Sequence, residues 1–145
     1  MTEVRLLGAR HGCDLAVGLL PDLREGLNAN LHAGLDYAKR AGARRVLVLA
    51  GDLPLLTADD VRQMVNVPSG TVVIAPDRHG RGTNALSLPL PQADEFVFAF
   101  GPDSLRRHAQ EATRLGLLMT AIHSPGLARD IDEPEDLPDA AALAR

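Results

Sequence analysis

The chain contains very little cysteine and few aromatic residues. Cys13 is the only cysteine, and there are three phenylalanines, one tyrosine and no tryptophan among 145 residues. A single cysteine excludes an internal disulfide and a cysteine-based zinc cluster, and it fits a reducing compartment. No apolar stretch approaches the roughly 20 residues that a membrane-spanning helix needs, and the first residues do not resemble a signal peptide. We therefore expect a soluble, cytoplasmic protein.

Basic residues are outnumbered by acidic ones. Fifteen Lys and Arg against nineteen Asp and Glu give a net charge of -4. No global positive field therefore draws the chain to nucleic acid or to an anionic membrane, and any anion site must be local. The phosphate-loop, nucleophile-elbow and dinucleotide-binding motifs are missing too, and the five histidines show no metal-ligand spacing. These absences leave hard, oxygen-rich sites as the main candidates.

Short apolar runs alternate with segments of helical periodicity. The sequence predicts strands at 14–20, 45–50, 71–75, 85–90 and 117–122, and helices at 27–41, 57–65, 101–115 and 134–144. Residues 4–7 are apolar but too short to assign. At this length and spacing we expect a single domain over 1–145, a Rossmann-like three-layer α/β/α fold with a mostly parallel sheet.

Three local patterns refine this prediction. Asn28 is a plausible N-cap for the first helix, and Thr57 with Asp60 has the spacing of a capping box. The three phenylalanines at 96, 98 and 100 alternate with other residues, which puts their rings on one face. We interpret them as core residues.

Asp52 follows an unbroken apolar run at 46–50, which is typical of a strand buried on both faces. A carboxylate at the C-terminal end of such a strand lies where α/β sheets bind ligands, and a hard oxygen ligand there suits Mg²⁺ carrying a phosphate. A turn-capping role before Pro54 explains Asp52 equally well.

Two segments have the composition of anion sites. The loop at 76–84 contains Arg78, Arg81 and two glycines, so arginine forks and backbone N–H groups can face a phosphate or carboxylate. Gly101 and Ser104 lie where a helix begins, so its N–H groups and dipole attract an anion. A solvated turn and ordinary helix capping are the respective alternatives.

The segment at 129–136 is strongly acidic. Alternation across Ile131 puts Asp130 and Asp132 on the same side if the segment is extended. Near Asp52, two such carboxylates would make a metal site of the oxygen-ligand kind. We attribute the later acids, including Asp136, to the N-terminus of the following helix, where negative charge is favourable.

Five segments together resemble one family of enzymes. They are REGLNANL at 24–31, VLVLAGDLPLL at 46–56, APDRHGRGTNALSL at 75–88, FAFGPDSLRRH at 98–108 and PGLARDIDEPEDL at 125–137. GDLP alone is common among nucleotidyltransferases, but the third and fifth segments together are far more specific. The chain resembles the 2-phospho-L-lactate guanylyltransferases, also described as phosphoenolpyruvate guanylyltransferases, of coenzyme F-420 biosynthesis.

The resemblance implies a nucleotide-diphospho-sugar transferase type of fold, dependence on Mg²⁺, and transfer of GMP from GTP to a phosphorylated three-carbon acid with release of pyrophosphate. By position, Asp52 and Asp130 correspond to the catalytic metal carboxylates, with Asp132 as a third metal ligand. The acid would be held by Thr83, Gly101 and Ser104, with Arg78 and Arg81 of the neighbouring loop. The nucleotide would lie near Gly26, Leu27 and Asn28.

This chemistry needs no general base. The second pKa of a phosphate monoester is about 6, so the attacking oxygen of the acid is already ionised at neutral pH. Catalysis then consists of holding two polyanions in line and neutralising charge on the α-phosphate and the departing pyrophosphate. The candidate residues include the arginines, N–H groups and carboxylates for that task.

The resemblance also implies a front segment with a lysine-bearing loop, for which this sequence has no counterpart. Three explanations are a misplaced start, a second polypeptide that supplies the segment, and a shortened protein without activity; we favour the first. If the chain begins at Met1, an open strand edge predicts self-association, for instance as a homodimer.

The identity of the acceptor is left open by the sequence. It can be phospholactate, phosphoenolpyruvate or 3-phosphoglycerate. The alternatives are another acceptor, such as a molybdopterin or a sugar phosphate, and a non-catalytic module that binds a phosphorylated metabolite or a partner chain.

Overall fold

The computed structural model describes residues 4–9, 15–21, 23–132 and 134–136. It divides into two compact units, Met1–Ala43 and Arg44–Arg145, which are described separately here. The single domain expected over 1–145 stays a prediction. No helix in the described ranges is long and apolar enough to cross a membrane.

The first unit contains a β-hairpin and one long helix. Strand β1 (Val4–Ala9) pairs antiparallel with β2 (Leu15–Leu20), which settles the short N-terminal segment as a strand. Helix α1 (Leu27–Arg40) follows. Its N-cap is Gly26, at a φ of 95° that favours glycine, so the prediction of Asn28 as the cap is wrong.

The second unit contains a four-stranded sheet in the order β3-β5-β4-β6. Its strands are β3 (Arg45–Leu49), β4 (Thr71–Pro76), β5 (Thr83–Pro89) and β6 (Leu118–Ala121). Strand β4 pairs parallel with β6, and β5 runs antiparallel to both β3 and β4. Three strands thus share one direction as predicted, while β5 departs from it because only the short loop 77–82 connects β4 to β5.

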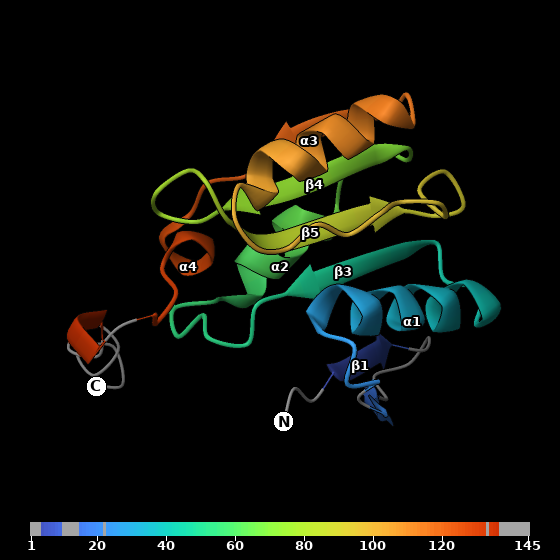
Figure 1. The fold of residues 1–145 in the computed structure, drawn as a ribbon, viewed down its shortest axis with the longest axis horizontal. Coiled ribbons are helices and arrows are strands. Elements are labelled where there is room, and N and C mark those ends of the chain that lie inside the picture. The colour runs from blue at the N-terminus through green and yellow to red at the C-terminus, as the bar shows by residue number, and fades with distance from the viewer. Residues whose placement is uncertain (1–3, 10–14, 22, 133, 137–145) are drawn as a thin grey trace. The chain divides into compact units, whose positions relative to one another are not determined.

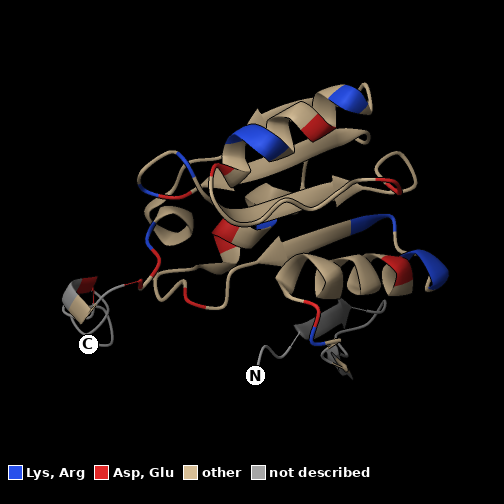
Figure 2. Ribbon diagram, in the orientation of Figure 1, with Lys and Arg blue, Asp and Glu red and all other residues tan. Residues whose placement is uncertain are grey.

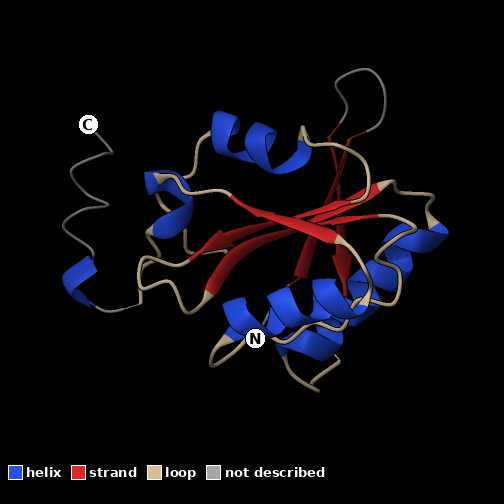
Figure 3. Ribbon diagram, turned by 90° about the horizontal axis from the view of Figure 1, so that it is seen from above, coloured by secondary structure: helices blue, strands red, loops and turns tan. Residues whose placement is uncertain are grey.

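Helices cover both faces of this sheet, as the view in Figure 3 shows. Helix α2 (Ala58–Val65) lies on one face and α3 (Ser104–Arg114) on the other. The predicted capping box of α2 is confirmed, because Thr57 Oγ1 accepts from the N–H of Asp60 and the Asp60 carboxylate accepts from the N–H of Thr57. The three-layer α/β architecture is therefore confirmed for this unit.

The C-terminal part contains two short helices. Helix α4 (Pro125–Ala128) follows β6, and a 3-10 helix, η1, spans Pro134–Asp136. The predicted helix at 134–144 is represented by η1 alone, because its remaining residues lie outside the described ranges.

The two central strands supply the core. Every residue of β4 and β5 is buried. On one face, Val73 and Ala75 pack with Met64 of α2, with Leu53 beyond β3 and with Leu127 of α4. Phe96 and Phe98 are also buried, in a segment that is not a strand, whereas Phe100 is half-buried. The predicted core role is therefore confirmed for the first two. Leu53 thus anchors the segment that contains Asp52, and Leu127 anchors the segment that precedes Asp130.

Candidate functional site

The predicted site residues of the second unit gather at one end of its sheet. Asp52 follows β3, the loop 77–82 follows β4, and Thr83 begins β5. Because β5 is antiparallel to both neighbours, its first residues meet the last residues of β3 and β4. Helix α4 and the start of α3 lie at the same end (Figure 1), and acidic and basic positions occur together on its loops (Figure 2). Ligands of α/β sheets bind at this edge.

Asp52 is joined to the acidic segment through the backbone. The N–H of Ile131 donates a hydrogen bond of 3.1 Å to the carbonyl oxygen of Asp52. Asp52 itself is exposed, while the next residue, Leu53, is buried in the core. The structure thus joins the backbone at Asp52, after the end of β3, to the segment that contains Asp130 and Asp132.

The Asp130 carboxylate has one oxygen that is buried without a hydrogen bond. Among the described residues, its Oδ1 is the buried side-chain oxygen that has no hydrogen-bond partner. Burial raises the pKa of Asp130, and a hydrogen bond from its own backbone N–H opposes this rise. The negative charge of Asp132 adds to the rise, while Arg78 lowers the pKa. A buried anionic oxygen without a donor fits a hard cation such as Mg²⁺, so the donor set is compatible with the implied metal.

A small cavity adjoins this carboxylate. Its volume is about 10 Å³, enough for about one water molecule, and its lining includes Asp130, Asp136, Arg78 and Arg129. Within the part of the chain that the structure describes, no three Asp, Glu, His or Cys side chains approach closely enough to hold a metal ion. The site of three aspartates therefore stays a prediction.

Helix α4 holds the acidic segment in place through two close contacts. Ser124 caps α4 and also hydrogen-bonds the carboxylate of Asp60 on α2. A Cβ on Gly126 would lie 2.7 Å from the carbonyl oxygen of Leu55 and would collide with the Asp60 carboxylate. Only glycine therefore allows α4 to approach α2 this closely.

Asn84 ties the same helix to the sheet. Its side-chain amide donates to the carbonyl oxygens of Leu127, at 3.0 Å, and Ala128, at 3.4 Å. The backbone carbonyl oxygen of Asn84 accepts from the N–H of Ala50 at 2.8 Å. One buried residue thus links the end of β3, the start of β5 and the end of α4, and so positions the acidic segment beside Asp52.

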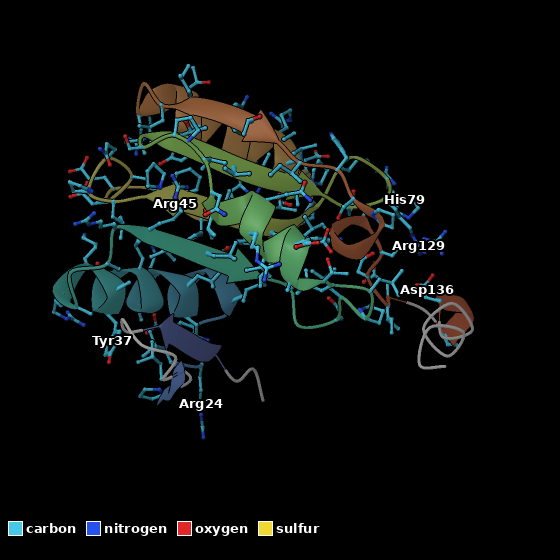
Figure 4. The ribbon with its side chains drawn as sticks, turned by 180° about the vertical axis from the view of Figure 1, so that it is seen from behind. Arg24, Tyr37, Arg45, His79, Arg129 and Asp136 are labelled. Carbon is cyan, nitrogen blue, oxygen red and sulfur yellow. The ribbon has the colours of Figure 1, made fainter. Side chains whose placement is uncertain are left out.

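Arg78 pairs with a carboxylate of the acidic segment, Asp136. Its Nη1 donates to Asp136 Oδ1 at 2.6 Å, and Asp136 Oδ2 accepts from the N–H of Asp132 at 3.0 Å. This hydrogen bond to Asp136 raises the pKa of Arg78. Figure 4 shows Asp136 on η1 and Arg129 beside α4. Asp136, which the sequence assigned to helix stabilisation, instead bridges Arg78 and the backbone of the acidic segment.

The loop 77–82 folds around Asp77, which sequence reasoning missed. The Asp77 carboxylate accepts from the N–H of Arg81 at 2.9 Å. Burial pushes the pKa of Asp77 upward, but hydrogen bonds from the N–H groups of Arg81, Gly82 and His79 outweigh it and hold the pKa below its usual value. These N–H groups are therefore occupied, so the expectation that they face a bound anion is wrong.

The Arg81 side chain lies elsewhere. It lines a groove of about 410 Å³ with Arg106, His123 and the apolar side chains of α3 and β6, whereas Arg78 lines the small cavity. The structure thus separates the two arginines that the sequence had grouped, and their role with a substrate stays a prediction.

The three residues expected to hold the acid come together. Ser104 Oγ donates to Thr83 Oγ1 at 3.1 Å, and the N–H of Ser104 donates to the carbonyl of Gly101 at 3.2 Å. Thr83 Oγ1 is also 3.0 Å from His108 Nδ1. The backbone of α3 is joined to the loop, because the N–H of Leu105 donates to the carbonyl of Arg81 at 3.0 Å.

His108 is the buried base of this cluster. Its exposed fraction is 0%, and burial lowers its pKa to about 4, against a smaller opposite effect of Glu111. Its Nε2 accepts from the N–H of Ala99 at 3.0 Å. His108 is therefore neutral near pH 7 and is not a candidate proton carrier there.

The predicted nucleotide residues belong to the first unit. Gly26 caps α1, and Leu27 and Asn28 form its first turn. The role of these three residues with the nucleotide stays a prediction.

Comparison with known proteins decides the family. Residues 12–141 match the family model described as "Guanylyl transferase CofC like". The chain belongs to this family. The resemblance inferred from the five sequence segments is thereby confirmed.

Relatives of this CofC-like chain are named as guanylyltransferases. The chain is 46% identical over 127 residues to a phosphoenolpyruvate guanylyltransferase of Chloroflexus aggregans, covering 87% of this chain and 62% of the relative. It is 43% identical over 144 residues to that of Sphaerobacter thermophilus, covering 98% and 66%. A 2-phospho-L-lactate guanylyltransferase of Methanopyrus kandleri is 36% identical over 99 residues, covering 68% and 50%. The chain thus spans less than two thirds of these relatives.

A solved structure confirms the fold type. A protein of Desulfovibrio desulfuricans G20, described as a nucleotide-diphospho-sugar transferase, superposes with a TM-score of 0.63 at 17% identity, covering 77% of this chain and 49% of that one. At this identity the likeness concerns the fold alone. The predicted nucleotide-diphospho-sugar transferase type of fold is confirmed for this CofC-like chain.

Proposed function

We propose that this chain takes part in transfer of GMP from GTP to a phosphorylated three-carbon acid, with phosphoenolpyruvate as the acceptor. The observation that carries the proposal is the placement of an acidic segment and a hydroxyl pair at one end of one sheet. The hydrogen bond from the Ile131 N–H holds the acidic segment against the backbone of Asp52. In the hydroxyl pair, Ser104 Oγ donates to Thr83 Oγ1. Membership of the CofC-like family supports the guanylyl donor.

The hydroxyl pair supports binding of an acid. Thr83 and Ser104 lie where α3 begins, so their hydroxyl groups and the positive end of the helix dipole favour an anion at the same place. Gly101, at a φ of 124°, lets the chain turn into this helix. A carboxylate or phosphate oxygen is the ligand that such a set of donors selects.

The transfer itself is a displacement at the α-phosphorus of GTP. An ionised phosphate oxygen of the acid forms the new P–O bond, and the bond to the β-phosphate oxygen breaks, releasing pyrophosphate. Because the attacking oxygen is ionised near pH 7, no side chain has to remove a proton. This agrees with a site in which His108 is neutral and buried.

Asp52, Asp130 and Asp132 are the residues that would hold the divalent cation. Bound there, Mg²⁺ would neutralise negative charge on the phosphate oxygens. In the chain itself, Asp130 Oδ1 is left without a donor. The hydrogen bonds that Ile131 and Asn84 donate fix the backbone around Asp130. Arg78 and Arg129 lie beside the same cavity and add positive charge.

The names of the relatives favour the acceptor. Seven relatives at 36–46% identity are named phosphoenolpyruvate guanylyltransferase, and a relative named for 2-phospho-L-lactate matches a shorter part of the chain at 36%. We therefore expect phosphoenolpyruvate to be preferred over 2-phospho-L-lactate and 3-phosphoglycerate.

Release of pyrophosphate from GTP and Mg²⁺ tests the proposal. Each of the three acids is added in turn, and a sugar phosphate serves as the comparison. We expect release with phosphoenolpyruvate and little or none with the sugar phosphate. Release with the sugar phosphate alone would assign a different acceptor, and the absence of turnover with every acid would favour a non-catalytic, ligand-binding module.

A further inference from the structure

His108 has a ring whose protonation pattern is set by the backbone. The N–H of Ala99 donates to Nε2 at 3.0 Å, so this nitrogen carries no hydrogen. The single hydrogen of the neutral ring is therefore on Nδ1, which lies 3.0 Å from Thr83 Oγ1 and donates to it. The direction of this second bond follows from the first.

The hydrogens of the two neighbouring hydroxyl groups can then be counted. Thr83 Oγ1 accepts from His108 Nδ1 and also from Ser104 Oγ, which lies 3.1 Å away. A hydroxyl oxygen has two lone pairs and one hydrogen, so both acceptor positions of Thr83 are filled. The Thr83 hydroxyl can then bind a third partner only by donating its hydrogen, so that partner must be an acceptor.

We propose that His108 is a positioning residue that fixes the Thr83–Ser104 hydroxyl pair as a hydrogen-bond donor to an oxyanion of the bound acid. The proposal rests on the proposed function for the identity of the acid, but the direction of the His108–Thr83 hydrogen bond rests on the backbone amide of Ala99. In the opposite tautomer, Nδ1 would accept the Thr83 hydrogen, and Thr83 would have none to offer.

The surroundings of His108 keep this arrangement in place. Phe96 and Phe100 lie against the ring, with centroids at 5.8 and 4.7 Å, and the ring is fully buried. Burial lowers the pKa of His108 to about 4, although the nearby Glu111 of α3 opposes the shift. A neutral ring over the physiological range leaves one hydrogen to place, and the Ala99 amide places it on Nδ1.

The tautomer is measurable without any ligand or activity. In ¹⁵N-labelled protein at pH 7, the two ring nitrogens of His108 differ in shift according to which one carries the hydrogen, and His108→Asn identifies their signals. We expect a protonated Nδ1 and an unprotonated Nε2. A protonated Nε2 would overturn the positioning role, whatever the protein catalyses.

Binding of phosphoenolpyruvate to the full chain tests the consequence. His108→Asn keeps a side-chain N–H near the position of Nδ1, whereas His108→Phe keeps the ring shape and removes the donor. We expect affinity to fall roughly tenfold in His108→Phe, and much less in His108→Asn, because a hydrogen bond to a charged group becomes misdirected. Thr83→Val should match His108→Phe, and His32→Asn on α1 should bind as the wild type does.

Two results would contradict this part of the proposal. Equal affinity of wild type and folded His108→Phe would remove the link between the ring and the acid. Failure of the wild type to bind any of the three acids would reject the ligand together with the proposed function, while the tautomer measurement would still decide the direction of the hydrogen bonds. If His108→Phe does not fold, Thr83→Val tests the same donor.

Discussion

The N–H of Ile131 donates to the carbonyl oxygen of Asp52 at 3.1 Å, although the two residues are far apart in the sequence. This bond carries the acidic segment across the end of β3. It leaves Asp52 exposed and puts Asp130 where one of its oxygens is buried without a donor. The arrangement costs stability in the free chain and supplies an anionic oxygen for a cation.

Asp130→Asn should therefore stabilise the chain when Mg²⁺ is absent, because it removes the charge of a half-buried carboxylate whose Oδ1 has no hydrogen-bond donor. Wild type should gain stability when Mg²⁺ is added, since a ligand that binds only the folded state shifts unfolding, and the variant should not. Urea unfolding with and without Mg²⁺ measures both effects. Asp36→Asn, at an exposed pair with Lys39, is the matched control. Equal Mg²⁺ responses in wild type and Asp130→Asn would reject Asp130 as a ligand.

Asn84→Ala should destabilise the chain by about 1–3 kcal/mol, because it leaves the carbonyl groups at the end of α4 without their donor. It should also weaken the response to Mg²⁺, since α4 positions the acidic segment. Chemical denaturation measures the first effect and Mg²⁺ titration the second. Asn66→Ala, at the C-cap of α2, is the comparison. A loss of stability with an unchanged response to Mg²⁺ would limit Asn84 to a structural role.

Gly126→Ala should lower the midpoint of thermal unfolding, because its Cβ would collide with the Asp60 carboxylate and lie 2.7 Å from the carbonyl oxygen of Leu55. Gly34→Ala is the contrasting variant. The nearest atom to its Cβ is Leu20 Cδ1 at 4.0 Å, and alanine favours a helix interior, so stability should hold or rise. Equal midpoints for the two variants would show that α4 can move away from α2 at no cost.

Stability should fall as the pH is lowered from about 6.5 to about 4, with His108 as one cause. In the unfolded chain an imidazole binds a proton near pH 6.5, but burial lowers the pKa of His108 to about 4 in the folded chain. The unfolded state therefore binds more protons in this window, and folding loses up to roughly 3 kcal/mol as pH falls through it. Urea unfolding of wild type and His108→Asn at several pH values measures the contribution. An identical pH dependence in both would contradict it.

Local patterns predicted the parts of the site that depend on short spacing. The capping box at Thr57, the strand before Asp52 and the helix start near Ser104 all follow from residues a few positions apart. The grouping of Thr83 with Ser104 came from family resemblance, and the structure brings their hydroxyl groups together.

Long-range contacts could not be predicted in this way. Asn84 binds a carbonyl 43 positions away, and Arg78 pairs with Asp136 at a separation of 58. Neither bond leaves a periodic signal in the sequence. The prediction for the loop 77–82 was wrong for a related reason, because its own Asp77 accepts from the N–H groups that were expected to face an anion.

Formation of the guanylylated product from GTP, Mg²⁺ and phosphoenolpyruvate, followed by ³¹P NMR in wild type and Asp130→Asn, tests the central claim most directly. We expect wild type to convert the monoester signal of phosphoenolpyruvate into that of a diphosphate diester while pyrophosphate appears, and Asp130→Asn to react at least about a hundredfold more slowly, as expected for loss of a group that stabilises transition-state charge. Equal rates in the two proteins, or no product with wild type, would contradict the account.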